Sequence, residues 1–387
     1  ASECTCNTGV TYMRLNKDFR YFTYIEQPES FAKQFSDIDK LSELFRFLGD
    51  KMNLKVVMYL LSLDNGEVAG ASTIATHLGY PKEKIEKALQ YLLSINGSNK
   101  EIIEISVLCA DNGVVAQGVS QTDAGVTRAV LENLVARRTS VCRMAAVARC
   151  AVVPVDMGIA GVPVPGAIDC RIAPGTQDFT QGAAMTRAQA VQGIAAGIQL
   201  VREQKRAGMQ IIATGEMGIG NTTTSSAVAS VLLHRPVPEM TGRGAGLSDA
   251  GLQRKICAIE AGIARNAPDA DDPLDVLAKL GGFDIAGLCG VFLGGALENV
   301  PILMDGFISS VAALCAVRLC PAAEKAVFAS HISGEPAARL VLEELHKKPL
   351  ISADFHLGEG TGAVASLPLW DMALAVYTGC YSFAEGG

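Results

Sequence analysis

Two turns that combine glycine with glutamate are the strongest candidates for chemistry in this sequence. The first, GEMGIGNTT at residues 215–223, follows the apolar run MQIIAT, and the second, LGEGTGA, spans residues 357–363. Glycine lets backbone N–H groups approach a ligand closely. The first turn leads into a helix-like segment, so it directs unpaired N–H groups and the positive end of the helix dipole outward. It therefore suits an anion such as a phosphate.

Neither of the common nucleotide-binding motifs describes the first turn. No Gly-Lys-Ser/Thr follows it, as a Walker motif requires, and its glycine spacing differs from the dinucleotide fingerprint. Each turn instead carries a glutamate, Glu216 or Glu359. A single glutamate of this kind is most often a solvated turn residue. Because two such turns occur, both bracketed by apolar segments, we interpret both glutamates as candidate catalytic carboxylates.

Strands and helices alternate from about residue 101 onward. Apolar runs rich in β-branched residues at 101–110, 150–158, 209–214 and 300–306 predict strands, and the patterns at 186–208 and 251–266 predict helices. Such alternation is typical of a parallel sheet with helices on both faces, an α/β fold. In this fold ligands bind beyond the carboxyl ends of the strands, where the first turn lies.

Residues 1–100 differ in composition from the rest of the chain, with more charge and more aromatic residues. Helical spacing occurs at 35–62 and again at 81–96. We predict a small helical domain over residues 1–100, completed by the C-terminal helix, and an α/β domain over residues 101–387.

The charge of the chain argues mildly against nucleic acid as a partner. The 387 residues carry a formal net charge of −7, whereas nucleic-acid binding favours a basic surface. Residues 54–95 also fit the helix pattern of a winged-helix DNA binder. The lysines on its last helix, at 82, 84 and 87, are offset by Glu83 and Glu86. We therefore expect no nucleic-acid partner.

Nothing in the sequence indicates a membrane or a metal. No apolar run is long enough to span a bilayer, and we recognise no signal peptide. The 11 cysteines include no two pairs at zinc spacing, so we expect free, mostly buried thiols. These features predict a reducing, cytoplasmic location.

Eight segments together resemble one enzyme family, nicotinate mononucleotide:5,6-dimethylbenzimidazole phosphoribosyltransferase. The resemblance runs from about residue 93 to residue 383, and the order and spacing of the segments are those of the family. The segments are CADNGVVAQGVSQTDAGVT, VPVDMGIAG, GEMGIGNTTTSSA, GRGAGL, VLAKLGGFDIAGLCGVFLGGA, LMDGFISSVAAL, SHISGEPAA and LGEGTGA.

The resemblance implies transfer of phosphoribose from nicotinate mononucleotide to an aromatic base, as needed for the lower ligand of cobamides. The base attacks C1′, nicotinate leaves, and the β-riboside becomes an α-riboside. The pyridinium leaving group needs no acid, but the nucleophile must lose a proton. The resemblance implies Glu359 as the general base, with Glu216 beside the sugar or as a second carboxylate. It implies no metal and no organic cofactor.

Substrate-binding roles follow from the resemblance position by position. Lys255 corresponds to a lysine that compensates the phosphate charge, although a lysine on a helix is otherwise most often solvated. The other implied substrate-binding residues are Gly215, Gly218, Gly220, Asn221, Thr222, Ser333, Gly358, Gly360 and Asp111. For three further polar residues, His331, Asp305 and Asp284, we expect structural roles such as helix capping.

Two departures from the family pattern concern the aromatic nucleophile. The segment ATHLGYPKEKIEK at 75–87 replaces a Thr-Lys-Pro-x-Gly-Ser-Leu-Gly segment of the family, and Thr122 and Val130 stand where well-known members have polar pocket residues. Some relatives work as heterodimers that attach phenol or p-cresol through oxygen. The base is therefore left open between a benzimidazole and a phenol. The assembly is left open between a homodimer and a heterodimer with a paralogous chain, in which this chain could be a non-catalytic or partner-dependent subunit.

Overall fold

The computed structural model describes residues 6–7, 10–13, 51–62, 69–85, 87–88 and 103–379. By its internal contacts the chain divides into two compact units, Ala1–Asn99 and Lys100–Gly387.

The first unit contains helices and a small antiparallel sheet. Its elements are β1 (Cys6–Asn7), β2 (Val10–Met13), α4 (Lys51–Ser62), β3 (Ala69–Gly70) and α5 (Ala71–Leu78). β2 pairs with β1 and with β3, both antiparallel. The helical spacing of this region did not predict these short strands. Helical residues at 82–85 and 87–88 fall within the helix predicted at 81–96, whereas residues 35–50 of the other predicted helix lie outside the described residues.

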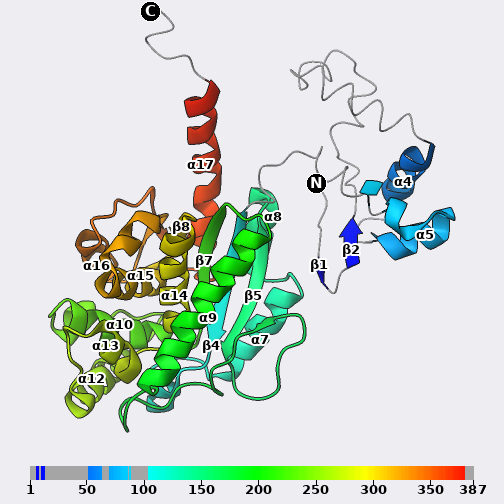
Figure 1. Cartoon of the computed structure of the whole chain (residues 1–387). Coiled ribbons are helices and arrows are strands. Elements are labelled where there is room, and N and C mark those ends of the chain that lie inside the picture. Colours follow the sequence, from blue (N-terminus) through cyan, green and yellow to red (C-terminus); the bar gives the residue numbers. More distant parts are fainter. Residues whose placement is uncertain are drawn as a thin grey trace, which may run out of the picture. The chain divides into compact units, whose positions relative to one another are not determined.

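A six-stranded parallel sheet forms the centre of the second unit (Figure 1). The strand order is β6-β5-β4-β7-β8-β9, and every pairing is parallel. The predicted α/β fold is confirmed. The strands are β4 (Ile103–Ala110), β5 (Ala151–Gly158), β6 (Ile168–Asp169), β7 (Ile211–Met217), β8 (Ile302–Met304) and β9 (Val327–Ala329).

Helices cover both faces of this sheet, because alternate strand residues face opposite sides. On β4, Leu108 and Ala110 belong to a larger apolar cluster with α9, α10, α12, α13, α14, α15 and α16. Val107 and Cys109 belong to a second cluster with α7, α8 and α17. The helices are α7 (Gly125–Val135), α8 (Ser140–Ala148), α9 (Arg187–Arg206), α10 (Asn221–Leu232), α11 (Val237–Met240), α12 (Asp249–Asn266), α13 (Pro273–Leu280), α14 (Phe283–Glu298), α15 (Phe307–Leu319), α16 (Ala338–Glu344) and α17 (Thr361–Gly379).

Local sequence signals explain where the predicted helices begin. Thr186 and Gln189 form a capping box at the start of α9, and the Ser248 side chain accepts the Gly251 N–H at the start of α12. Two 3₁₀ helices, Gly113–Gln117 and Pro321–Ala326, lie in the connections between β4 and α7 and between α15 and β9.

The C-terminal part of the second unit adds a small sheet and the long helix α17. Strands β10 (His331–Ser333) and β11 (Ile351–Phe355) pair in parallel. The helix α17 contacts α8 and β7 within this unit, and its pairing with the N-terminal unit stays a prediction. Within the described residues, none of the helices has both the length and the apolar character needed to cross a membrane.

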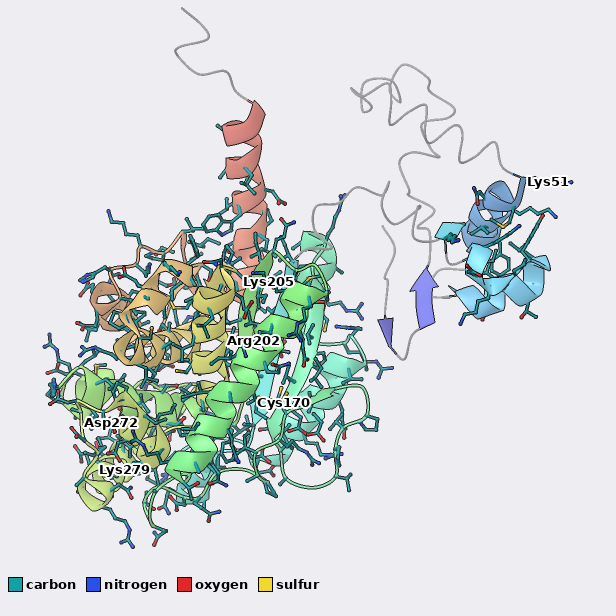
Figure 2. All side chains as sticks on the ribbon, in the orientation of Figure 1. Lys51, Cys170, Arg202, Lys205, Asp272 and Lys279 are labelled. Carbon is teal, nitrogen blue, oxygen red and sulfur yellow. The ribbon has the colours of Figure 1, made fainter. Side chains whose placement is uncertain are left out.

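Most ion pairs among the described residues of this unit involve partly exposed side chains, although the pair of His331 and Asp305 is buried. Arg202 on α9 pairs with Glu298 at the end of α14 with an N–O distance of 3.0 Å, and Lys205 lies one turn further along α9 (Figure 2). Exposed pairs of this kind contribute only ~0–1 kcal/mol each. Among the predicted thiols, Cys289 is a buried free thiol, whereas Cys257 is exposed, contrary to the expectation of burial.

Candidate active site

A pocket of about 350 Å³ opens at the carboxyl ends of the central strands. Its walls come from the ends of β7, β8, β10 and β11, from the loop at 241–247 and from the segment at 119–121. This is the edge where parallel sheets bind ligands. The predicted site residues that line it are Glu216, Gly218, Gly220, Asn221, Thr222, Val130, Ser333, Gly358 and Glu359.

The two glycine-glutamate turns pack directly against each other beside this pocket. A Cβ atom on Gly215 would lie 2.4 Å from the carbonyl oxygen of Glu359, and one on Gly360 would lie 2.8 Å from the carbonyl oxygen of Thr214. Both positions therefore require glycine, because even a methyl group would overlap the other turn. Gly215 and Gly360 belong to the site as its packed floor rather than as pocket-lining residues.

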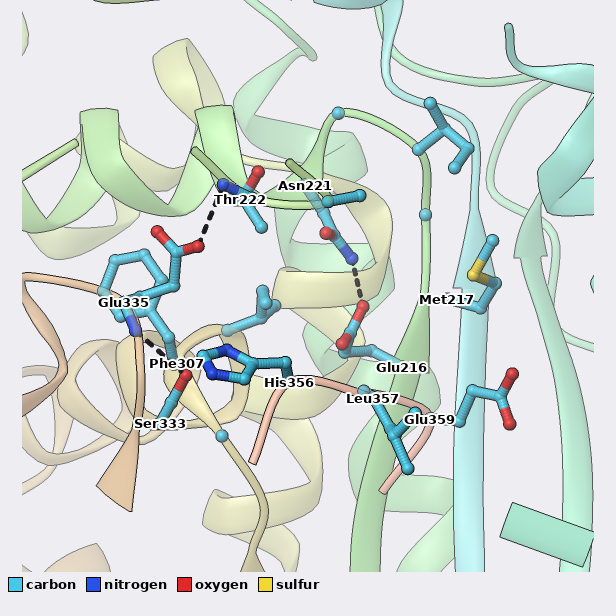
Figure 3. Close-up of a pocket in the computed structure, with 18 of the residues that line it drawn as sticks. Glu216, Met217, Asn221, Thr222, Phe307, Ser333, Glu335, His356, Leu357 and Glu359 are labelled. Atoms are coloured by element: carbon cyan, nitrogen blue, oxygen red, sulfur yellow. Dashed lines mark hydrogen bonds between the residues drawn. The ribbon is translucent and has the colours of Figure 1, made fainter. Parts of the chain in front are cut away.

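Glu216 is the more deeply buried of the two glutamates. Its Oε2 accepts a hydrogen bond from the side-chain amide of Asn221 (Figure 3), and the side chain is only 8% exposed. Burial raises the pKa of Glu216 to about 8, and the nearby carboxyl group of Asp284 contributes to the rise. Glu216 is therefore mainly a neutral acid at pH 7 in the free site, and it can donate a hydrogen bond.

Glu359 has a different environment. Its backbone is left-handed, with a φ of 59°, and its Oε2 accepts the backbone N–H of Val141 in the first turn of α8 at 3.2 Å. A carboxylate at a helix N-terminus is stabilised by the helix dipole. In Figure 3 the side chains of Glu216 and Glu359 point in opposite directions, although both line the pocket.

Lys255 lies behind one wall of the pocket. The side chain is fully buried, contrary to the usual solvated state of a helix lysine. Its Nζ donates to Thr222 Oγ1 at 2.9 Å and to the carbonyl oxygen of Gly242 at 3.0 Å. Burial lowers the pKa of Lys255 to about 8, and the carboxyl group of Glu335 opposes that change. Because Thr222 lines the pocket, this lysine brings a positive charge close to it.

The sequence reasoning missed two charged residues of the pocket, Arg243 and Glu335. Both lie in segments that resemble the family, GRGAGL and SHISGEPAA, and their place in these segments could have identified them as site residues. Arg243 lines the pocket and is held by the carboxylate of Asp249. Glu335 Oε1 accepts the N–H of Gly244 at 3.0 Å, and the Glu335 N–H donates to Ser333 Oγ at 3.4 Å (Figure 3).

Asp305 and His331 support the second turn, as expected for structural residues. The carboxylate oxygens of Asp305 accept the N–H groups of Gly360 at 3.2 Å and Ala363 at 2.9 Å, at the start of α17. His331 Nδ1 lies 3.8 Å from Asp305 Oδ1. Burial raises the pKa of Asp305, and His331 opposes that rise. The expected capping role of Asp305 is confirmed.

Besides Gly215, Gly360 and Lys255, two more of the predicted substrate-binding residues are not part of the pocket lining. Asp111 is buried, and its Oδ2 accepts the N–H of Ala160 at 2.8 Å, which ties the ends of β4 and β5 together. Thr122 is exposed. Val130 does line the pocket, so it is the better placed of the two residues that distinguish this chain in the base region.

The arrangement combines acid, base and anion-binding groups in one cavity. Glu216 is a proton donor near neutral pH, and Glu359 offers a carboxylate at a helix N-terminus. The positive end of α10, preceded by Gly218 and Gly220, and the nearby Lys255 favour a negative group. Such a site can hold an anionic substrate and move a proton during attack by a second substrate.

Comparison with known proteins agrees with this chemistry. A family model described as phosphoribosyltransferase matches residues 84–387. The nicotinate-nucleotide–dimethylbenzimidazole phosphoribosyltransferase of Acetivibrio thermocellus is 42% identical over 306 residues, which cover 78% of this chain and 87% of that protein. The enzyme of the same name from Desulforamulus reducens is 44% identical over 283 residues, which cover 73% of this chain and 81% of that protein.

Solved structures are also similar to this chain. The crystal structure of CobT from Thermus thermophilus has a TM-score of 0.71 at 34% identity, covering 87% of this chain and 99% of that one. A crystal structure of the nicotinate-nucleotide–dimethylbenzimidazole phosphoribosyltransferase from the same organism has a TM-score of 0.68 at 37% identity, covering 73% of this chain and 84% of that one. The chain belongs to the phosphoribosyltransferase family of the nicotinate-nucleotide–dimethylbenzimidazole enzymes.

Proposed function

We propose that the chain transfers phosphoribose from nicotinate mononucleotide to a benzimidazole-type base, releasing nicotinate and forming an α-riboside phosphate for cobamide synthesis. The observation that carries the proposal is the direct packing of the two glycine-glutamate turns, which brings Glu216 and Glu359 to one pocket. The curated relatives, which carry the name of this activity, support the same reaction.

The phosphate of the nucleotide is proposed to bind at the α10 end of the pocket. Backbone at Gly218–Thr222 lies at this end, and the buried ammonium group of Lys255 is held behind Thr222. Phosphate there gains the helix dipole and a charge-assisted interaction. Ser333, on the opposite wall, is proposed as a further hydroxyl contact for the nucleotide.

The transfer itself needs one base and a defined geometry. The aromatic nitrogen attacks C1′ from the face opposite nicotinate, so the β-riboside becomes an α-riboside. The electron pair of the breaking bond goes to the pyridinium nitrogen. The ring nitrogen without hydrogen supplies the lone pair for the new bond to C1′, and the N–H proton of the other ring nitrogen goes to the carboxylate of Glu359. A positioned base contributes ~10²–10⁴-fold to such a step, and holding both reactants in one pocket contributes through proximity.

The identity of the base and the assembly are also proposals. Val130, an apolar residue in the pocket lining, favours tolerance of phenol or p-cresol beside benzimidazoles. We propose a dimer, formed either by two copies or with a paralogous chain, whose stoichiometry light scattering would measure. The relatives are named as enzymes, so they do not favour the alternative that this chain is a non-catalytic subunit.

A product assay tests the proposed function. The purified chain is incubated with nicotinate mononucleotide and one of a panel of benzimidazoles, purines and phenols. Nicotinate release and the new riboside phosphate are followed by chromatography and mass spectrometry, and NMR determines the anomer. We expect an α-riboside phosphate from 5,6-dimethylbenzimidazole. No product from any base, with the chain alone and with its paralogue, would contradict the proposal.

A further inference from the structure

A buried amide bridges two carboxyl groups at the edge of the pocket. The side-chain nitrogen of Asn221 donates to Glu216 Oε2 and, at 3.1 Å, to Asp284 Oδ2 (Figure 3 shows the first bond). An amide nitrogen carries two hydrogens, so each carboxyl group receives one. Asn221 and Glu216 line the pocket. Asp284 does not line it and is completely buried.

Asp284 is itself held firmly by the start of α14. Its Oδ1 accepts the N–H of Ile285 at 2.9 Å. A Cβ atom on Gly282 would lie 2.3 Å from the same oxygen, so the backbone closes tightly over it. Asp284 therefore has the fixed position that a residue needs to orient another through hydrogen bonds. A simple helix cap would not also need the bond to Asn221.

Negative groups surround Glu216 from several elements. Beside burial, Asp284 on α14, Asp305 after β8 and Glu359 before α17 all raise its pKa. The buried thiol of Cys109 on β4 lies near Glu216, Asp284 and Glu359, and also near Asp156. Among the described residues, no ion pair joins Glu216 or Asp284 to a cation. Two adjacent buried carboxylates without a cation cannot both keep their charge at low cost, so the pair retains a proton.

We propose that Asp284 is a positioning residue for Glu216: acting through the Asn221 amide, it holds the Glu216 carboxyl group in the pocket as a hydrogen-bond donor to an oxygen of the bound nucleotide. The proposal rests on the proposed function for the identity of that nucleotide. It assigns donation to Glu216, while Glu359 accepts the proton of the attacking base. Asp284 touches no substrate; it acts on Glu216 through the Asn221 bond and through its own charge.

The direction of the pH effect follows from the same geometry. Burial raises the pKa of Glu216 to about 8 and that of Asp284 to about 6, so Glu216 is the acid that keeps the proton at neutral pH. The donor is lost when Glu216 ionises. In the nucleotide complex the donated bond further favours the neutral acid, so kcat should fall as the pH rises above about 8.

Two variants at opposite ends of the bridge test the proposal. Asp284→Asn removes the neighbouring charge, so the fall in kcat should move to lower pH by roughly one unit. Asn221→Leu keeps both acids but removes the bond that stabilises the charged form of Glu216, so the fall should move to higher pH. kcat is measured at saturating nicotinate mononucleotide, where Lys255 stays paired with the bound phosphate. Ionisation of Lys255 then does not cause the shift in the pH dependence of kcat.

Infrared spectroscopy gives a readout that needs no activity. The carboxylic-acid C=O band of Glu216 is identified by its loss in Glu216→Gln, and its disappearance with rising pH reports ionisation directly. We expect the band to vanish at lower pH in Asp284→Asn than in the unchanged chain. Should the chain have no transferase activity, the proposed function fails, yet this measurement still tests the bridge.

Asp156→Asn is the matched control, because it also neutralises a buried aspartate, one that lies near the carboxyl end of β5. Asp156 Oδ1 accepts the N–H groups of Gly158 and Ile159 and has no bond to the Asn221 bridge. It should leave both pH profiles unchanged. The proposal is overturned if the Glu216 band titrates identically in Asp284→Asn and the unchanged chain, or if Asp284→Asn and Asn221→Leu shift the fall in kcat in the same direction.

Discussion

Replacing Lys255 by methionine should separate substrate binding from folding. In the free protein this lysine is fully buried, and burial lowers its pKa from 10.5 to about 8. At roughly 1.4 kcal/mol per pH unit, this corresponds to a cost of about 3 kcal/mol for keeping the charge inside the fold. Methionine removes that cost but leaves the carbonyl of Gly242 without its donor, which costs ~1–3 kcal/mol.

The variant should therefore be as stable as the unchanged chain, or up to about 2 kcal/mol more stable. The cost of the buried charge is fully present below the folded-state pKa of about 8. It disappears as the pH rises towards 10.5, where the lysine of the unfolded chain also loses its proton. The gain in the free energy of unfolding of Lys255→Met should therefore be largest below pH 8 and disappear towards pH 10.5. Denaturant unfolding at several pH values measures this gain.

Binding should respond in the opposite way. Loss of a charged partner for the phosphate costs ~1.5–3 kcal/mol, which corresponds to a roughly 10- to 150-fold higher KM for nicotinate mononucleotide. The KM for the aromatic base should change much less. Inorganic phosphate should also stabilise the unchanged chain against unfolding more than it stabilises the variant.

Lys279→Met is the matched control. Lys279 is labelled on α13 in Figure 2 and pairs with Asp275 at 2.8 Å, and it is not part of the pocket lining. Its replacement also removes the bond from Lys279 Nζ to the carbonyl of Ala267, so it should cost ~1–3 kcal/mol of stability and leave KM unchanged. An unchanged KM for nicotinate mononucleotide in Lys255→Met, or an equal rise for both substrates, would refute the phosphate assignment.

Three further predictions concern the floor and walls of the pocket. Glu359→Gln should lower kcat by roughly 10²-fold or more with little change in nucleotide binding, and a normal kcat would assign the base elsewhere. Gly215→Ala should cost ~1–3 kcal/mol of stability, because its methyl group meets the carbonyl of Glu359. Gly182→Ala, with no atom within 4 Å of the added carbon, should be neutral in the same unfolding assay. Val130→Gln should lower turnover of p-cresol relative to 5,6-dimethylbenzimidazole, and equal effects in competition assays would argue against a role in base choice.

The main strands could be predicted because they are nearly continuous apolar runs, as buried parallel strands are. β4 and β7 follow this pattern and were found where the sequence indicated them. β6, by contrast, consists of the exposed residues Ile168 and Asp169, and β9 has three residues. Such short segments carry too little periodicity to be distinguished from loops.

The site was predictable in its glutamates but not in their surroundings. Glu216 and Glu359 stand out because glycines flank each of them, whereas the packing between their turns joins segments far apart in the chain. Asp284 stands in the first turn of a helix, one residue beyond a pair of glycines, so its sequence context indicates a cap. Only the fold brings it to Asn221. Lys255 lies in a helical pattern that does not reveal which face is buried.

The direct packing of the two glycine-glutamate turns also limits how this enzyme can be redesigned. With carbonyl groups of each turn lying where a side chain of the other would begin, the floor of the pocket has no room to vary by single substitutions. Variation in substrate range must therefore come from the walls. Val130 is the place to start, whereas the loop held by the bond from the Gly244 N–H to Glu335 lies beside Thr222 and Lys255, at the proposed phosphate end. A mutant library for new aromatic acceptors should keep the floor and this loop fixed and randomise the wall around Val130.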